Sequence, residues 1–344
     1  MTGLRTLTRL ANRLLQRIFI YPLFCLFLGC GGNNTPAAQK TSDTARTSRT
    51  SAALQILVAD WANHRVVRMD DMQGNNWTIF GYESANNPQF EFPISIGMDS
   101  AGRVYVAEQR RPRIVRFDNR RNAPAEELLL PGGANEQVNK YVGSWIFVDE
   151  LGKIFVTYDG SHRIVRVDDM QGTNWIAFGS EGSGTGQFRY PAGVWVDANQ
   201  RIYIADFDNF RIVRIDDMHG ANWTTLGSYG SGTSEFVNPC GIWGDQQGRI
   251  YVADQGNDRI VRFDDMQGTN WTSIGSFGTS QRTGTLYAPS GICVDPSGRI
   301  YVSECSSNHR IVRMDDMTGA NWTVLGTAGT GAKEFASPMG IFVR

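Results

Sequence analysis

The residues of this chain that could do chemistry recur at a regular spacing. An aspartate or glutamate stands five or six residues before the first arginine of an RIVR-like motif at five places: Asp60/Arg65, Glu108/Arg113, Asp206/Arg211, Asp254/Arg259 and Glu304/Arg310. Such carboxylates could form a ring of cation ligands. Short acidic side chains also cap turns, and each of these acids precedes an arginine that can neutralise it. We therefore predict an ion pair inside each repeated unit rather than a cation site.

Three of the four histidines stand directly before that arginine, at His64, His162 and His309. Three imidazoles would suit zinc if they met at one point. They belong to three different copies of the repeat, on turns that we expect to lie away from a common centre. The three rings should therefore point to separate places, and we predict no metal site.

These side chains are carried by six copies of a unit of about 48 residues, which together fill residues 54–344. The first arginines of the copies are 48, 50, 48, 48 and 51 residues apart. One copy contains four runs rich in β-branched and aromatic residues, at 191–197, 201–206, 211–218 and 222–228. Each run is bounded by turn residues, as short strands are. Six units of four antiparallel strands predict an all-β, six-bladed β-propeller.

The two ends of the repeat region fit together as one blade. The chain stops at PMGIFVR, which is a first strand, and residues 54–60 (LQILVAD) read as a second strand with no first strand before them. If the C-terminal strand joins the N-terminal blade, the ring closes and leaves no free sheet edge.

At residues 239–264 the sequence PCGIWGDQQGRIYVADQGNDRIVRFD resembles the NHL repeat, and the resemblance extends over about 85% of the chain. It implies a propeller. Proteins with NHL propellers include protein-binding, RNA-binding, sensor and enzyme domains, so the resemblance alone leaves function open. Propeller lyases and lactonases, such as streptogramin lyase and gluconolactonase, carry carboxylate, His or Asn groups around a metal at the axis.

The innermost strands supply the residues that would face such an axis. One of their columns reads Gly97, Phe147, Trp195, Trp243, Cys293 and Phe342. General acid–base catalysis needs two titratable groups within reach of one substrate, and this column has no such pair. We therefore assign no catalytic residue and no cofactor. The aromatic residues Phe147, Trp195, Trp243 and Phe342 are either core between blades or an apolar floor for an axial ligand.

The second copy lacks the DDM-x-G-x-NW block that the other five carry, and it is rich in arginine. A partner-binding surface is predicted there, formed by Arg110, Arg111, Arg113, Arg120 and Arg121. Acidic polymers or lipid head groups would fit its charge. The alternative is a degenerate copy with solvated arginines.

The first 29 residues carry four arginines, no acid and an apolar run at 18–28, which is typical of a secretory signal. The sequence FLGC resembles a bacterial lipobox ending at Cys30, although Phe27 stands where leucine is usual. The alternatives are a plain signal peptide and an amphipathic targeting helix. Residues 31–53 are small and polar, so we expect residues 30–53 to form a lipidated cysteine and a flexible tether.

A formal net charge of −1 argues against a nucleic-acid binder. The other three cysteines, Cys240, Cys293 and Cys305, show no CxxC spacing and predict no metal or redox cluster. The sequence thus favours an exported, lipid-anchored monomer that binds an envelope protein or ligand. The alternative is a lyase or lactonase.

Overall fold

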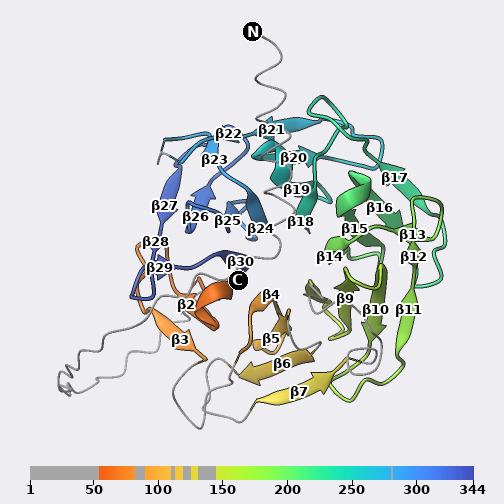
Figure 1. Cartoon of the computed structure of the whole chain (residues 1–344), viewed down its shortest axis with the longest axis horizontal. Helices are drawn as coiled ribbons and strands as arrows, with labels where there is room; N and C mark the ends of the chain where they lie inside the picture. The colour runs from red at the N-terminus through yellow and green to blue at the C-terminus, as the bar shows by residue number, and fades with distance from the viewer. Residues whose placement is uncertain (1–53, 82–89, 110–112, 119–124, 131–144, 280–281) are drawn as a thin grey trace. The chain divides into compact units, whose positions relative to one another are not determined.

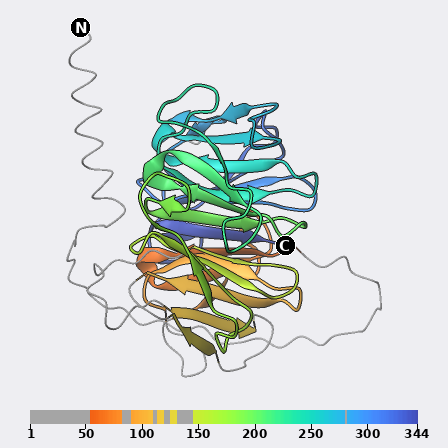
Figure 2. The same cartoon turned by 90° about the vertical axis from the view of Figure 1, so that its right-hand side faces the viewer.

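The computed structural model describes residues 54–81, 90–109, 113–118, 125–130, 145–279 and 282–344 (Figures 1 and 2). Residues 54–344 form six sheets of four strands, arranged as a ring. Every pair of neighbouring strands within these sheets is antiparallel. Helix in the described residues is confined to three short 3-10 turns, at Trp61–Asn63, Phe207–Asn209 and Gln255–Asn257. The predicted six-bladed β-propeller is confirmed.

The blades are numbered along the chain and their strands are given from the axis outward. Blade 1 consists of β30 (Pro338–Val343), β1 (Ile56–Asp60), β2 (Arg65–Met69) and β3 (Thr78–Phe80). Blade 2 consists of β4 (Pro93–Met98), β5 (Arg103–Glu108), β6 (Arg113–Asp118) and β7 (Glu126–Leu129). Blade 3 consists of β8 (Ile146–Val148), β9 (Ile154–Tyr158), β10 (Arg163–Val167) and β11 (Ile176–Phe178). Blade 4 consists of β14 (Pro191–Val196), β15 (Ile202–Asp206), β16 (Arg211–Ile215) and β17 (Thr224–Leu226). Blade 5 consists of β18 (Pro239–Gly244), β19 (Ile250–Asp254), β20 (Arg259–Phe263) and β21 (Thr272–Ile274). Blade 6 consists of β24 (Pro289–Val294), β25 (Ile300–Glu304), β26 (Arg310–Met314) and β27 (Thr323–Leu325).

Short parallel ladders lie in the connections that leave blades 3, 5 and 6. They pair β12 (Ser180–Glu181) with β13 (Gln187–Phe188), β22 (Ser276–Phe277) with β23 (Thr285–Leu286), and β28 (Thr327–Ala328) with β29 (Glu334–Phe335). They hold the chain as it returns from an outer strand to the axis.

The ring closes as the ends of the sequence predict. β30 pairs with β1 in blade 1, with Val343 opposite Ile56. Two further backbone bonds join Gln55 and Arg344, at 2.8 and 3.0 Å. The C-terminus accordingly lies at the centre of the ring in Figure 1. Three strands of this blade come from the start of the repeat region and one comes from its end, so this seam ties the two ends of the repeat region together.

The third and fourth strands of a blade are shorter than the sequence predicts. In blade 4, β16 ends at Ile215 and β17 begins at Thr224, so the Asp-Asp pair belongs to the hairpin turn. Asp217 Oδ1 accepts the backbone N–H groups of His219 and Ala221, at 2.8 and 3.1 Å. Gly220 adopts a φ of +81°, a left-handed conformation that glycine reaches without steric cost. The carboxylate therefore satisfies backbone donors in a turn, and the strand stops before it.

The hydrophobic core lies between blades. Every residue of the second strands β1, β9, β15, β19 and β25 is buried, because each sheet is covered on both faces by its neighbours. In one such cluster Tyr203 of blade 4 packs with Ile250 and Phe263 of blade 5. Near the axis the backbones approach closely: a Cβ added at Gly193 would lie 2.6 Å from the carbonyl oxygen of Cys240. A side chain at position 193 would therefore collide with the backbone of β18.

Candidate functional site

The five recurring acids are parts of the blades. Each is fully buried at the end of its second strand and is paired with the arginine that opens the third strand. The Oδ2–Nε distances are 2.7 Å for Asp60–Arg65 and 2.8 Å for Asp206–Arg211. The other oxygen of Asp206 accepts a backbone N–H from the connection into its own blade, at 2.7 Å. Burial raises the pKa of Asp60 and of Asp206 despite these partners. The predicted ion pairs are confirmed.

The histidines each join one blade to the start of the next. The Nδ1 atoms of His64, His162 and His309 accept the backbone N–H groups of Phe92, Tyr190 and Ser337, at 3.2, 3.1 and 2.9 Å. The three rings thus lie in three separate joints, as predicted. Within the described part of the chain, no group of three His, Cys, Asp or Glu side chains is placed to hold a metal ion.

Sequence reasoning missed a fourth member of this column. Asp258 stands directly before Arg259, as the histidines stand before their arginines, and its Oδ1 accepts the N–H of Ala288 at 2.8 Å. His64, His162, Asp258 and His309 all adopt the left-handed conformation. The position before the arginine was therefore a usable signal, because both residue types supply an acceptor from the same backbone geometry.

The four aromatic residues predicted at the axis divide into two groups. The rings of Phe147 and Trp243 have their centroids 5.9 Å apart, and those of Trp243 and Phe342 are 5.8 Å apart. These three, which we call the axial trio, come from blades 3, 5 and 1 and are partly exposed. Trp195 is only 6% exposed and packs against Tyr203, with ring centroids 4.9 Å apart. It belongs to the core between blades 4 and 5.

The size of the residue opposite explains this division. A side chain added at Gly244 of blade 5 would collide with the Trp195 indole, so the glycine leaves room for that ring between the blades. Cys293 is small enough to fit against blade 1, where the Val343 N–H lies 3.3 Å from its Sγ. For the axial trio, the next blade has a larger residue at the position that Gly244 occupies in blade 5. Phe147, Trp243 and Phe342 pack against clusters that contain Val196, Val294 and Met98, respectively. The rings of the axial trio therefore stay outside the joints between blades. Phe147 and Phe342 each contact Trp243 instead.

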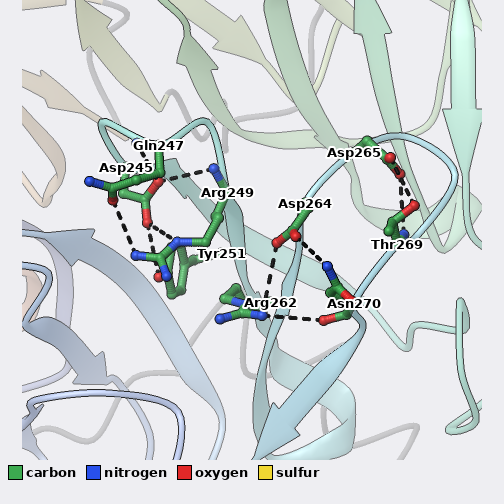
Figure 3. A network of polar contacts seen from close by, with 9 residues as sticks. All are labelled: Asp245, Gln247, Arg249, Tyr251, Arg262, Asp264, Asp265, Thr269 and Asn270. Atoms are coloured by element: carbon green, nitrogen blue, oxygen red, sulfur yellow. Dashed lines mark hydrogen bonds and ion pairs between the residues drawn. The ribbon is translucent and has the colours of Figure 1, made fainter.

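Charged residues at one end of the inner strands are held within tight turns (Figure 3). In blade 5, Asp245 Oδ2 accepts Arg249 Nε at 2.6 Å and the Tyr251 hydroxyl at 3.1 Å. Burial, followed by the Asp245 charge, raises the pKa of Tyr251 to about 12. Blade 3 has Lys153 and Phe155 at these positions, and Asp149 Oδ2 is buried there without a hydrogen-bond partner among the described residues. The turn network is complete in blade 5 and incomplete in blade 3.

The sequence model of the NHL repeat matches residues 188–215 and 286–314, which fall in blades 4 and 6. The protein is a six-bladed β-propeller that contains NHL repeats in blades 4 and 6. No curated protein sequence matches the chain.

Solved structures share this fold at low sequence identity. A chain of a nidogen/laminin complex is 16% identical, with a TM-score of 0.62 over 84% of this chain and 98% of that one. A virginiamycin B lyase from Staphylococcus aureus is 15% identical, with a TM-score of 0.53 over 81% of each chain. A streptogramin B lyase is 18% identical, with a TM-score of 0.50 over 70% of each chain. At such identities the likeness concerns the fold alone.

Of the five arginines predicted to form a partner-binding surface, the structure describes Arg113. Arg113 is 4% exposed and pairs with Glu108 and Glu127, so it belongs to the interior of blade 2 and leaves the candidate surface. The paired position of Arg113 was visible in the repeat, since it opens an RIVR motif. The other four arginines lie outside the described residues: Arg110, Arg111, Arg120 and Arg121. The lipidation candidate Cys30 also lies outside them. No described helix is long and apolar enough to cross a membrane.

Proposed function

We propose that this NHL propeller is a binding scaffold, exported and held at the cell envelope by a lipid on Cys30, which takes up an apolar or aromatic part of a protein or ligand at its axis. The axial trio carries the proposal. Its three rings make an apolar surface from three non-adjacent blades and are only partly covered. Rigid aromatic side chains contribute large contact area at low cost in conformational entropy.

The recurring charges support a binding role over an acid–base role at the axis. The acids at the ends of the second strands are buried in ion pairs, and Asp245 of the turn network is bonded to Arg249 and Tyr251. Proton transfer by such a group would first have to break bonds that hold a blade. The aromatic surface needs no such change.

Photocrosslinking tests the axial surface. With a photoreactive amino acid at position 342, we expect crosslinks to an envelope component that disappear when Trp243 is replaced by alanine. The matched control is Phe277→Ala, because Phe277 is an exposed aromatic residue on β22, 67% accessible, and is not part of the axial trio. Equal loss with both variants, or no loss with Trp243→Ala, contradicts the axial assignment.

Anchoring is tested separately from binding. We expect Cys30→Ser to move the protein from the membrane fraction to the soluble fraction, because removing an acyl chain removes about 0.8 kcal/mol of membrane affinity for each buried CH₂ group. Persistent membrane association of the variant contradicts the lipid anchor. Charge reversal at Arg110, Arg111, Arg120 and Arg121 tests whether those residues contribute to partner capture.

The second candidate function is a lyase, favoured by the fold likeness to streptogramin B lyase. Incubation of the protein with a streptogramin B, followed by liquid chromatography and tandem mass spectrometry, decides between the two, because elimination within one molecule leaves its mass unchanged. A product with a new retention time and fragment pattern that forms in proportion to enzyme concentration would replace the scaffold proposal with an enzyme. Unchanged antibiotic supports the scaffold.

A further inference from the structure

Arg163 of blade 3 differs from the other arginines that open a third strand. In the other five blades this arginine pairs with a fully buried carboxylate, and its side chain is between 4% and 13% exposed. In blade 3 the residue opposite Arg163 in the strand ladder is Tyr158. Arg163 is exposed, and within the described residues it forms no ion pair. Blade 3 therefore presents to solvent a guanidinium group that the other blades bury.

Tyr158 does not take over the role of the missing acid. Its ring packs edge to face against Trp175, with centroids 6.5 Å apart, and belongs to the core cluster between blades 2 and 3. A tyrosine hydroxyl is neutral near pH 7. The side chain thus fills space in the core but leaves the charge of Arg163 without a counterion.

A second exposed arginine, Arg189, stands at the joint between blades 3 and 4. It precedes β14 and likewise forms no ion pair with any described residue. His162, which precedes Arg163, accepts the backbone N–H of Tyr190, which follows Arg189, at 3.1 Å. The rings of His162 and Tyr190 meet edge to face with centroids 4.7 Å apart, and Tyr190 is 38% exposed. The bonded His162–Tyr190 pair therefore holds both arginines at one joint, beside an exposed aromatic ring.

The acids around this joint have other partners. Asp159 Oδ1 accepts the backbone N–H of the next residue at 2.5 Å, and Asp208 Oδ1 accepts the side-chain amide of Asn238 at 3.1 Å. Glu181 Oε2 lies 4.0 Å from His162 Nε2. None of these three described acids forms an ion pair with Arg163 or Arg189.

The other joints with described residues at these positions lack this combination. The backbone N–H of Arg189 bonds to the acid that ends the second strand, and the residues that make the same bond elsewhere are Glu91, Val237, Tyr287 and Ala336. None of these four is basic. At each of their joints the arginine of the preceding blade is paired with its own acid.

We propose that Arg163, Arg189 and Tyr190, which we call the arginine joint, form a docking site for an acidic segment of a partner protein. The counterparts of Arg163 in blades 4 and 5 bind a carboxylate through Nε at 2.8 Å, so a carboxylate from a partner is the complement that blade 3 lacks. An aromatic or apolar side chain between the acids packs on Tyr190. Binding at this joint requires no contact with the axial trio.

The number of charges favours a discrete acidic segment over a membrane. Attraction to an anionic lipid surface comes from clusters of about four to eight basic residues. The arginine joint has two, and the side chain of Glu181 at the same joint is 70% exposed. A broad anionic surface would meet that carboxylate, whereas a short segment can place its acids on the arginines alone.

Selection from a displayed library of random peptides tests the arginine joint. With the full-length protein at low ionic strength, we expect enrichment of peptides that carry at least two acidic residues and an aromatic residue. A synthetic peptide of that set should bind more weakly as salt is added, measured by fluorescence anisotropy. Arg163→Gln and Arg189→Gln should each weaken its binding about fivefold, and the double variant about 25-fold, because each exposed ion pair contributes modestly.

Arg282→Gln is the matched control, because Arg282 is an exposed arginine in the connection between blades 5 and 6. This variant loses the same charge outside the arginine joint and should bind the peptide like the parent. Equal weakening by Arg282→Gln overturns the proposal, as does an enriched set without acidic residues. Acidic peptides that bind the double variant as tightly as the parent also overturn it.

Vesicles of phosphatidylcholine and phosphatidylglycerol are the second probe. We expect the parent and the double variant to bind them equally. Vesicle binding that the double variant loses, with no enrichment of acidic peptides by the parent, assigns the two arginines to a membrane and overturns the protein-docking site.

Discussion

Replacing His309 by asparagine should remove a pH-dependent contribution to the stability of the ring. His309 Nδ1 accepts the N–H of Ser337 at 2.9 Å, directly before β30, the strand that closes the ring. Only neutral imidazole can accept this bond. Burial lowers the pKa of His309, so the unfolded chain binds its proton more tightly than the folded chain does. The stabilisation that His309 contributes is therefore complete when the pH is above 6.5, the ordinary pKa of imidazole. It is lost as the pH falls through the lower pKa of the folded state.

The expected difference is about 1 kcal/mol, the net value of one hydrogen bond, because Ser337 is partly exposed and water can replace the imidazole. Asparagine suits the left-handed conformation that His309 adopts at φ 44°, and its side-chain oxygen accepts at any pH. Urea unfolding followed by tryptophan fluorescence should show parent and variant alike at pH 7.5. At pH 5 the parent should be less stable by that amount.

Hydrogen exchange at the Ser337 amide gives an independent measurement. In the parent its protection, corrected for intrinsic rate, should fall between pH 7.5 and pH 5, and in His309→Asn it should stay constant. Asp258 titrates in the same interval with the opposite sign, but it is common to both proteins and cancels in their difference. Equal pH dependence of parent and variant in both measurements refutes the assignment of His309 as an acid-sensitive joint.

Three further changes test the joints and the axis. Burial raises the pKa of Asp258 from 3.8 to about 6, so the ionised carboxylate costs stability progressively as the pH rises from 3.8 through about 6; Asp258→Asn should add about 3 kcal/mol at pH 7.5 and about half of that at pH 5, measured by urea unfolding. Gly193→Ala should cost about 2–3 kcal/mol because its Cβ would lie 2.6 Å from a backbone oxygen, whereas Gly184→Ala, whose neighbour is the flexible end of Gln187, should leave the thermal midpoint almost unchanged. Trp243→Ala should cost about 3–5 kcal/mol through loss of the central ring of the axial trio, and calorimetry would show a smaller loss if that ring were solvated.

Much of the fold could be predicted from the sequence because the pattern of a four-stranded blade recurs in six copies. The unpaired strand patterns at 54–60 and 338–344 predict the seam between β1 and β30, since each lacks the partner that the other provides. The ends of strands were less predictable. Residues 216–218 continue the apparent strand pattern, but Asp217 can bond the N–H groups of His219 and Ala221 only if the chain turns there. Local side-chain bonds decide such boundaries.

The site was only partly predictable because neighbouring blades decide it. Phe147, Trp195, Trp243 and Phe342 occupy equivalent positions in their own repeats, so one repeat cannot distinguish them. Trp195 enters the core because Gly244 stands across the joint, about one repeat further along the chain. The hydroxyl of Ser290 in blade 6 likewise contacts residues of both neighbouring blades, Cys240 of blade 5 and Met339 of blade 1. Comparing each column with its neighbour in the next blade, instead of reading each column alone, would have separated these cases.

The same comparison shows that blade 3 departs from the repeat at positions where blades 4, 5, 6 and 1 agree. Trp145 stands where blades 4, 5, 6 and 1 have the glycine that meets the next inner strand, and Tyr158 replaces the acid at the end of the second strand. The Tyr158 hydroxyl is buried without a partner among the described residues, and burial raises its pKa. At the other end of the blade, Asp149 Oδ2 is also buried without a hydrogen-bond partner among the described residues. Each unpaired buried polar atom costs about 1–3 kcal/mol, a cost that the regular blades avoid by pairing the corresponding groups.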